Sequence, residues 1–385
     1  MKGTLLRRFP LLSIAPLLFA CAAQAPAPPV QLLGGIVRSD HHVRAPSTAP
    51  GMNGAETDIY VREVNWPGVL SQIPAPRRVV LFVHGSGTPG EVAFDVPYSD
   101  YSWMAYLAHG GFDVFAMDMT GYGRSTRPPA MNDACNFPKA QQPQFVPVVI
   151  AAPCQPSHPT AITTLESDWN DIGAVVDYLR RERGVEQVAL VGWSQGGPRI
   201  AGYVLRNPGK VSRIFVLAPD YVRDMAGTAP DPGKAADGQM GAVSYDDFTS
   251  GWIRQIGCNA QYQPATGEAI WKEMLGSDPV AATWGPGVRR APNVTSWGFN
   301  KDAAARITIP FAVATGQFDK QVAPERVNDL YDDLASFDKL LIDLACSSHN
   351  AMWEKNHLML FQASLEWLRD GRVSGLTHVK LRLGY

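Results

Sequence analysis

Short apolar runs alternate with amphipathic segments along most of this chain of 385 residues. A run such as residues 188–191, apolar at every position, is typical of a strand buried on both faces of a sheet. Residues 168–183 instead carry apolar side chains three or four positions apart, which is the spacing of one helix face. The pattern predicts strands at 58–64, 78–83, 112–117, 188–191, 214–217, 307–314 and 339–344, and helices at 101–109, 168–183, 199–206, 324–334 and 358–369.

This alternation of strands and helices predicts an α/β fold, with a mostly parallel central sheet of about eight strands and helices on both faces. The strand at 58–64 is expected on the outside of the sheet. The alternation breaks at residues 221–305, where aromatic side chains stand among many Gly and Pro residues. Because ligands bind beyond the carboxyl ends of the strands in such sheets, we predict that residues 221–305 form a cap over that edge. The core then comprises residues 56–220 and 306–385, interrupted by a long Pro-rich loop at 127–160.

The first 25 residues have the pattern of a signal peptide. A positively charged start precedes a short apolar core, and Ala23-Gln24-Ala25 provides a cleavage site. Cys21 lies in a loose lipoprotein box, so lipid attachment at Cys21 competes with cleavage after Ala25. We therefore expect an exported protein that is periplasmic, secreted, or anchored to the outer membrane through Cys21. Residues 26–55 are rich in Pro, Ala and Gly and are predicted to form a loosely ordered arm.

Composition narrows the classes of partner. The net charge is −2 and no basic run occurs, which argues against nucleic acid. No Cys/His cluster has the spacing of a metal site, and no G-x-G-x-x-G follows the first strand, so neither a metal nor a nucleotide cofactor is expected. Four cysteines follow Cys21, and an even number in an exported chain favours two disulfides. Three pairings are open; we favour Cys135 with Cys154 and Cys258 with Cys346.

The strongest candidate for chemistry is Gly192-Trp193-Ser194-Gln195-Gly196, which joins the strand at 188–191 to the helix at 199–206. In this context G-x-S-x-G forms a sharp turn that raises the serine hydroxyl at the carboxyl edge of the sheet. Gly192 and Gly196 stand where a Cβ would collide as the chain reverses. The helix N-terminus beneath Ser194 favours developing negative charge.

A serine nucleophile needs a base and an orienting acid. His349 follows the strand at 339–344, and Asp319 follows the strand at 307–314, which gives the chain order Ser, Asp, His that accompanies this turn. Asp220, after the strand at 214–217, is the alternative acid. Among the other histidines, His84 is interpreted as a structural loop residue and His357 as a surface residue at a helix end.

An acyl-transfer site also needs donors for the tetrahedral oxyanion. The backbone N–H groups of Gln195 and Ser86 are the candidates, because Gln195 follows the serine and Ser86 lies in the loop after the strand at 78–83. Trp193 beside the serine is expected to pack beneath the turn.

Together these segments resemble the α/β-hydrolase superfamily, over roughly residues 79–369 without the cap. The carrying motifs are the loop at 83–87, the D-x-x-G-x-G-x-S segment at 118–125, the turn at 192–197, the acid loop at 315–319, and His349 with the terminal helix. The resemblance implies a hydrolase without a cofactor, most often a carboxylesterase or a lipase-like enzyme. A serine at position 194 argues against relatives that use an aspartate nucleophile.

The leading expectation is an exported serine hydrolase that cleaves an apolar or aromatic carboxylic ester through Ser194, His349 and Asp319 and an acyl-enzyme. An amidase, peptidase, thioesterase or lactonase would use the same machinery, so a small-molecule apolar ester is one of several substrate classes. A cofactor-free lyase, or a binding scaffold without catalysis, is a further alternative.

Overall fold

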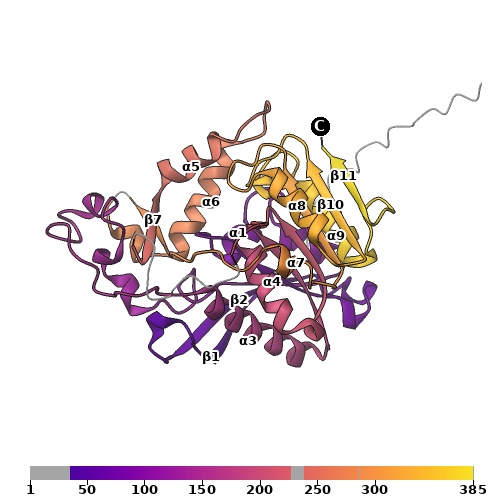
Figure 1. Ribbon diagram of the computed structural model, residues 1–385, viewed down its shortest axis with the longest axis horizontal. Helices are drawn as coiled ribbons and strands as arrows, with labels where there is room; N and C mark the ends of the chain where they lie inside the picture. The colour runs from indigo at the N-terminus through magenta and orange to yellow at the C-terminus, as the bar shows by residue number, and fades with distance from the viewer. Residues whose placement is uncertain (1–34, 227–237, 286, 385) are drawn as a thin grey trace, which may run out of the picture. The chain divides into compact units, whose positions relative to one another are not determined.

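The computed structural model describes residues 35–226, 238–285 and 287–384, which belong to one compact unit. The predicted signal peptide and Cys21 lie outside these residues. Within them, nine strands form one sheet (Figure 1), in the order β1 (Val37–Pro46), β2 (Glu56–Asn65), β4 (Asp113–Met117), β3 (Val79–Val83), β5 (Val188–Trp193), β6 (Val211–Leu217), β9 (Phe311–Gly316), β10 (Lys339–Leu344) and β11 (Val379–Leu383). From β4 to β11 the neighbouring strands are parallel, whereas β2 is antiparallel to β1 and β4.

Helices cover both faces of this sheet, as expected. One face packs against α2 (Trp103–His109) and α9 (His357–Asp370), and the other against α3 (Leu165–Arg183), α4 (Gly196–Arg206) and α8 (Pro324–Asp333). Strand β3 shows why both faces are apolar: Phe82 packs toward α2 and α9, while Leu81 and Val83 pack toward α3 and α4. The short helix α1 (Gly90–Phe94) also packs on the face that carries α2.

The main corrections concern the two edges of the sheet. Part of the stretch predicted as a loosely ordered arm is the edge strand β1, which pairs with β2 along ten residue positions. The strand predicted at 58–64 is therefore the second strand of the sheet and not its outer strand. At the opposite edge β11 was not expected. Both edge strands are largely solvent-exposed, so they lack the apolar runs that mark buried strands.

The segment at 221–305 contains several elements of its own: β7 (Met240–Ser244), α5 (Tyr245–Ile253), α6 (Pro264–Ser277), β8 (Val288–Pro292) and α7 (Lys301–Ala304). Strands β7 and β8 form an antiparallel pair. Helices α5 and α6 lie side by side (Figure 1), with Phe248 of α5 stacked on Trp271 of α6. None of the described helices has the length and apolarity needed to cross a bilayer.

The loop at 127–160 belongs to the same layer. Its Phe137 and Phe145 stack on each other and both contact Trp284 edge-on. These rings share a separate apolar cluster with residues of β7 and β8. The long loop therefore packs against the segment at 221–305, which is the predicted cap.

Two disulfides join the cysteines in the favoured pairing. Cys135 is bonded to Cys154 within the long loop, and Cys258 to Cys346. The second bond connects the segment after α5 to the loop that follows β10, two segments that are 88 residues apart in sequence.

Peptide mapping without reduction tests this pairing. Digestion of the alkylated native protein is expected to release one linked peptide containing Cys135 and Cys154 and another containing Cys258 and Cys346. Alkylated single peptides from all four positions, before any reductant is added, would contradict the pairing.

A buried arginine links two helices to the loop after β3. Arg199 of α4 is inaccessible to solvent, and its Nε donates to Asp168 Oδ2 of α3 at 2.7 Å. Its Nη1 donates to the carbonyl oxygens of His84 at 2.8 Å and Gly85 at 3.0 Å. One guanidinium therefore holds the loop at 84–87 against the start of α4.

Replacing Arg199 with Met is expected to lower the free energy of unfolding by about 3–5 kcal/mol, because the Asp168 carboxylate would stay buried without its partner. Chemical denaturation measures the loss. The double variant Arg199→Met/Asp168→Asn is the control and should recover part of the stability, since it leaves no unpaired charge. A single-variant loss below about 1 kcal/mol, the level of an exposed pair, would refute this account.

Candidate functional site

The turn between β5 and α4 holds Ser194 in a left-handed conformation, with φ of +56°. A non-glycine residue pays about 1–3 kcal/mol for such a backbone, so the surroundings must impose it. A Cβ on Gly192 would meet Ile200 Cδ1 at 2.7 Å, and a Cβ on Gly196 would overlap the carbonyl oxygen of Val83. Both glycines are therefore required by close approach, and the half-buried Ser194 lies at the carboxyl end of β5.

Backbone hydrogen bonds fix this turn to the neighbouring strand. The N–H of Ser194 donates to the carbonyl oxygen of Leu217 at 2.9 Å, and the N–H of Asp220 donates to that of Ser194 at 3.1 Å. The end of β6 and the residues just after it thus hydrogen-bond to both the N–H and the carbonyl group of Ser194.

His349 and Asp319 are adjacent and buried. His349 Nδ1 lies 2.8 Å from Asp319 Oδ2, while Asp319 Oδ1 accepts from the backbone N–H groups of Gln321 and Val322, each at 2.8 Å. With the carboxylate as acceptor, Nδ1 carries the hydrogen and Nε2 is left as the proton acceptor. The alternative acid Asp220 instead forms an ion pair with Arg326 at 2.6 Å.

The loop that carries His349 is held by a buried carboxylate that the sequence analysis did not single out. Glu354 accepts from the backbone N–H of Ser348 at 2.7 Å, from Trp252 Nε1 of α5 at 2.7 Å and from Gln261 Nε2 at 3.1 Å. Burial raises the pKa of Glu354. The carboxylate thereby connects the cap to the His349 loop, close to the Cys258–Cys346 bond.

Ser86 and Gln195 lie on opposite sides of the serine turn. A Cβ on Gly85 would meet Ser194 Cβ at 3.0 Å, so the loop at 84–87 runs directly against the serine. Among the described residues, neither the N–H of Ser86 nor that of Gln195 donates to another backbone or side-chain acceptor. Both groups are therefore free to donate to a ligand oxygen. The Gln195 side chain is engaged elsewhere, with its amide donating to the carbonyl oxygen of Val294 at 2.7 Å.

His84 and His357, the two histidines weighed against His349, are also buried, but they lie in different surroundings. His84 bonds through Nδ1 to the carbonyl oxygen of Gly85 and accepts from the N–H of Met119, and burial lowers its pKa well below the usual value. This fits its interpretation as a structural residue. The interpretation of His357 as a surface residue was wrong: it starts α9 as expected, but it is buried beneath Tyr101 and lies 3.1 Å from Asp100.

Ser86, Ser194 and His349 line one pocket of about 640 Å³ under the cap. Asp319 lies behind His349 and does not line it. Trp193 is both buried and part of the wall, and its Nε1 donates to the carbonyl oxygen of His349 at 2.9 Å. The rest of the wall is Thr88, Val243, Asp247, Phe248, Gly251, Trp252, Arg254, Gln255, Arg289, Lys320, Gln321, Asn350 and Trp353.

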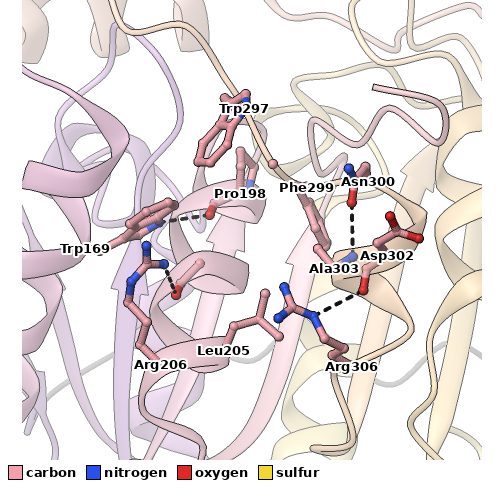
Figure 2. A pocket seen from close by; sticks show the side chains of 12 residues that line it. Trp169, Pro198, Leu205, Arg206, Trp297, Phe299, Asn300, Asp302, Ala303 and Arg306 are labelled. Carbon is pink, nitrogen blue, oxygen red and sulfur yellow. Dashed lines mark hydrogen bonds between the residues drawn. The ribbon is translucent and has the colours of Figure 1, made fainter. Parts of the chain in front are cut away.

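A second, smaller pocket of about 310 Å³ lies between α3, α4 and α7 (Figure 2). Trp169 and Arg206 form one side, with the guanidinium 3.9 Å from the centre of the indole ring. It contains none of the site residues predicted from the sequence. No group of three or more His, Cys, Asp or Glu side chains able to hold a metal ion occurs in the described part of the chain.

Comparisons with known proteins agree with this fold. A family model described as "alpha/beta hydrolase fold" matches residues 78–356. A search of curated proteins found no match. An esterase from Thermogutta terrifontis is 16% identical, with a TM-score of 0.54, over 86% of this chain and 99% of that one.

Two further solved structures are similar. An esterase from Exiguobacterium antarcticum is 15% identical, with a TM-score of 0.52, over 86% of this chain and 100% of its own. A monoacylglycerol lipase from Paleococcus ferrophilus is 18% identical, with a TM-score of 0.50, over 82% of this chain and 99% of its own. At these identities the likeness concerns the fold. Because the family model covers more than half of the sequence, the chain belongs to the α/β-hydrolase family.

Proposed function

We propose that this α/β-hydrolase is a serine hydrolase that cleaves a carboxylic ester through Ser194, His349 and Asp319. The observation that carries the proposal is the 2.8 Å contact between His349 and Asp319, with the histidine and Ser194 lining the same pocket. The chain order Ser194, Asp319, His349, which accompanies this type of turn, also supports the proposal.

In this mechanism the Ser194 hydroxyl attacks the ester carbonyl while His349 Nε2 accepts its proton. Asp319 keeps the imidazole in the required tautomer and stabilises the imidazolium. The free N–H groups of Ser86 and Gln195 would hold the oxyanion, a donor type worth about 3 kcal/mol each. His349 then returns the proton to the leaving alcohol, and water hydrolyses the acyl-enzyme by the same steps.

The pocket wall supports an ester with an apolar or aromatic part. Phe248, Trp252 and Trp353 contact one another on the cap side, and such rings favour apolar ligand surface. An amidase, thioesterase or lactonase would use the same catalytic groups, and a panel of esters, amides, thioesters and lactones separates them. The two disulfides are consistent with the proposed export of the protein.

Replacing Ser194 with Ala is expected to lower kcat for p-nitrophenyl butyrate by about a millionfold, since the nucleophile is lost. A fluorophosphonate probe should label the wild-type protein and not the variant. Ser250→Ala, at an exposed serine of α5, is the matched control and should keep both properties. Unchanged turnover by a folded Ser194→Ala protein would refute the assignment, and wild-type labelling would count against a lyase.

A comparison of the variants Asp319→Asn and Asp220→Asn tests which aspartate is the orienting acid. An amide at 319 no longer fixes the tautomer of His349, so kcat is expected to fall by about 10⁴-fold. Asp220→Asn removes only a partly exposed ion pair with Arg326, and its effect should stay below about fivefold. Steady-state kinetics on the same ester measures both, and the reverse order of effects would reassign the acid to Asp220.

A further inference from the structure

Two consecutive arginines on β8 point in opposite directions. Successive side chains of a strand project to opposite faces, so Arg289 and Arg290 cannot share an environment. Arg290 is buried and pairs with Asp278, with Nη2 2.9 Å from Oδ1 and Nε 3.1 Å from Oδ2. Arg289 instead lines the pocket that contains Ser194 and His349.

The guanidinium of Arg289 lies directly on the loop at 84–87. A Cβ on Gly87 would overlap its Nη1, Nη2 and Cζ atoms, so the guanidinium packs directly against the Gly87 backbone. The same loop runs against Ser194 at Gly85. Arg289 therefore stands in the wall of this pocket, against the loop that also contains Ser86.

Arg289 has no partner within the described residues. No hydrogen bond or ion pair is formed by its guanidinium there, and its Nε is buried without an acceptor. Every other described arginine that is buried or half-buried donates to a carboxylate or a carbonyl oxygen; these are Arg62, Arg78, Arg127, Arg180, Arg183, Arg199, Arg213, Arg223, Arg290 and Arg326.

No acid nearby is available to it. Asp278 accepts from Arg290 and lies 3.5 Å from Arg127 Nη2. Burial lowers the pKa of Arg289 to about 10, so the side chain remains a cation at neutral pH. Arg289 is half-buried, and a charge that is partly removed from water without a partner is unfavourable, so a ligand that supplies the partner would regain part of that energy.

The other charged side chains in the pocket wall are also mostly cations. Arg254 and Lys320 are exposed cations in its wall. Asp247 is the single carboxylate among the described residues of the lining, and it caps the start of α5 by accepting from the N–H of Ser244. Asp319 lies behind His349. A pocket with three cations and one engaged carboxylate attracts anions.

We propose that Arg289 binds a carboxylate group carried by the substrate, so that this enzyme hydrolyses anionic esters such as half-esters of dicarboxylic acids or esters of hydroxybenzoates. The planar fork of a guanidinium matches a carboxylate through two parallel hydrogen bonds. The aromatic side chains across the pocket contact the apolar part of the same molecule. This inference rests on the proposed ester hydrolysis and specifies its substrate class.

Two pairs of esters test the proposal. One pair places the charge on the acyl side, mono-p-nitrophenyl glutarate against p-nitrophenyl valerate, and the other on the alcohol side, 4-carboxyphenyl butyrate against phenyl butyrate. The wild-type enzyme is expected to prefer the anionic member of at least one pair in kcat/KM. Arg289→Met should reduce this preference by about 10- to 100-fold, mainly through KM, which is the range of a hydrogen bond to a charged group.

Arg289→Lys should restore part of the preference, because it returns the charge without the fork. Arg306→Met is the matched control at an exposed arginine of the second pocket (Figure 2), and it should leave the ratio unchanged. An absent preference in both pairs, or an equal loss of kcat on both members in a folded Arg289→Met protein, would overturn the proposal. The second result would make Arg289 a general contributor to the reaction.

Calorimetry separates this inference from the proposed function. Glutarate should bind to the Ser194→Ala protein, and binding should be lost in Ser194→Ala/Arg289→Met. If no ester is hydrolysed but glutarate binds through Arg289, the hydrolase proposal fails and the anion site stands. If esters are hydrolysed through Ser194 but glutarate does not bind and the ratio is insensitive to Arg289, the anion site fails and the hydrolase stands.

Discussion

The left-handed backbone at Ser194 is the constraint on which the rest of the site depends. The chain leaves β5 and enters α4 within two residues, and this is feasible only because Gly192 and Gly196 allow contact with Ile200 and Val83. That close approach also brings the loop after β3 against the serine. Gly192 and Gly196 lack a Cβ, and this permits both the strained backbone at Ser194 and its close approach to the loop that contains the Ser86 N–H.

The cap is connected to the chemistry by more than its position. Cys258 is bonded to Cys346, and Trp252 of α5 donates to Glu354, which in turn holds the backbone of Ser348 next to His349. Gln255 adds a third link, because its Oε1 accepts from the N–H of Lys320 beside Asp319. The segments that carry Asp319 and His349 are thus both held by residues of α5 and of the segment between α5 and α6, so that the conformation of residues 252–258 and the placement of His349 are coupled.

The sequence predicted most of the core because buried strands have a clear signature. β3, β5 and β10 are apolar at most positions and were located within one or two residues at each end. β1 and β11 were missed because an edge strand that faces solvent carries polar side chains and shows neither a run nor a clean alternation. The elements of the cap were missed for another reason, since β7 and β8 are short and become strands only by pairing with each other.

In the candidate site, too, some residues could be recognised from the local sequence pattern and others only from their three-dimensional surroundings. Ser194, His349 and Asp319 could be proposed from the sequence because each follows a strand, and parallel strands bring such positions to one edge. Glu354 and Arg289 could not, because what sets them apart is the set of partners around them. Two adjacent arginines on a strand indicate only that their side chains point to opposite faces. Which of them forms an ion pair depends on the position of Asp278, eleven residues before Arg289.

Backbone strain at Ser194 and several polar groups without partners occur in the pocket where the proposed substrate would bind. Arg199 with Asp168 and Arg290 with Asp278 show that the fold pairs its buried cations when stability alone is involved. At the pocket the fold instead keeps a strained serine, two backbone N–H groups without acceptors and a guanidinium without a carboxylate. In the proposed reaction, the two N–H groups would bind a developing oxyanion and the guanidinium would bind a fixed negative charge. The distribution of unsatisfied groups therefore supports the proposed ligand, which has one oxygen that gains charge during the reaction and a second group that carries charge from the start.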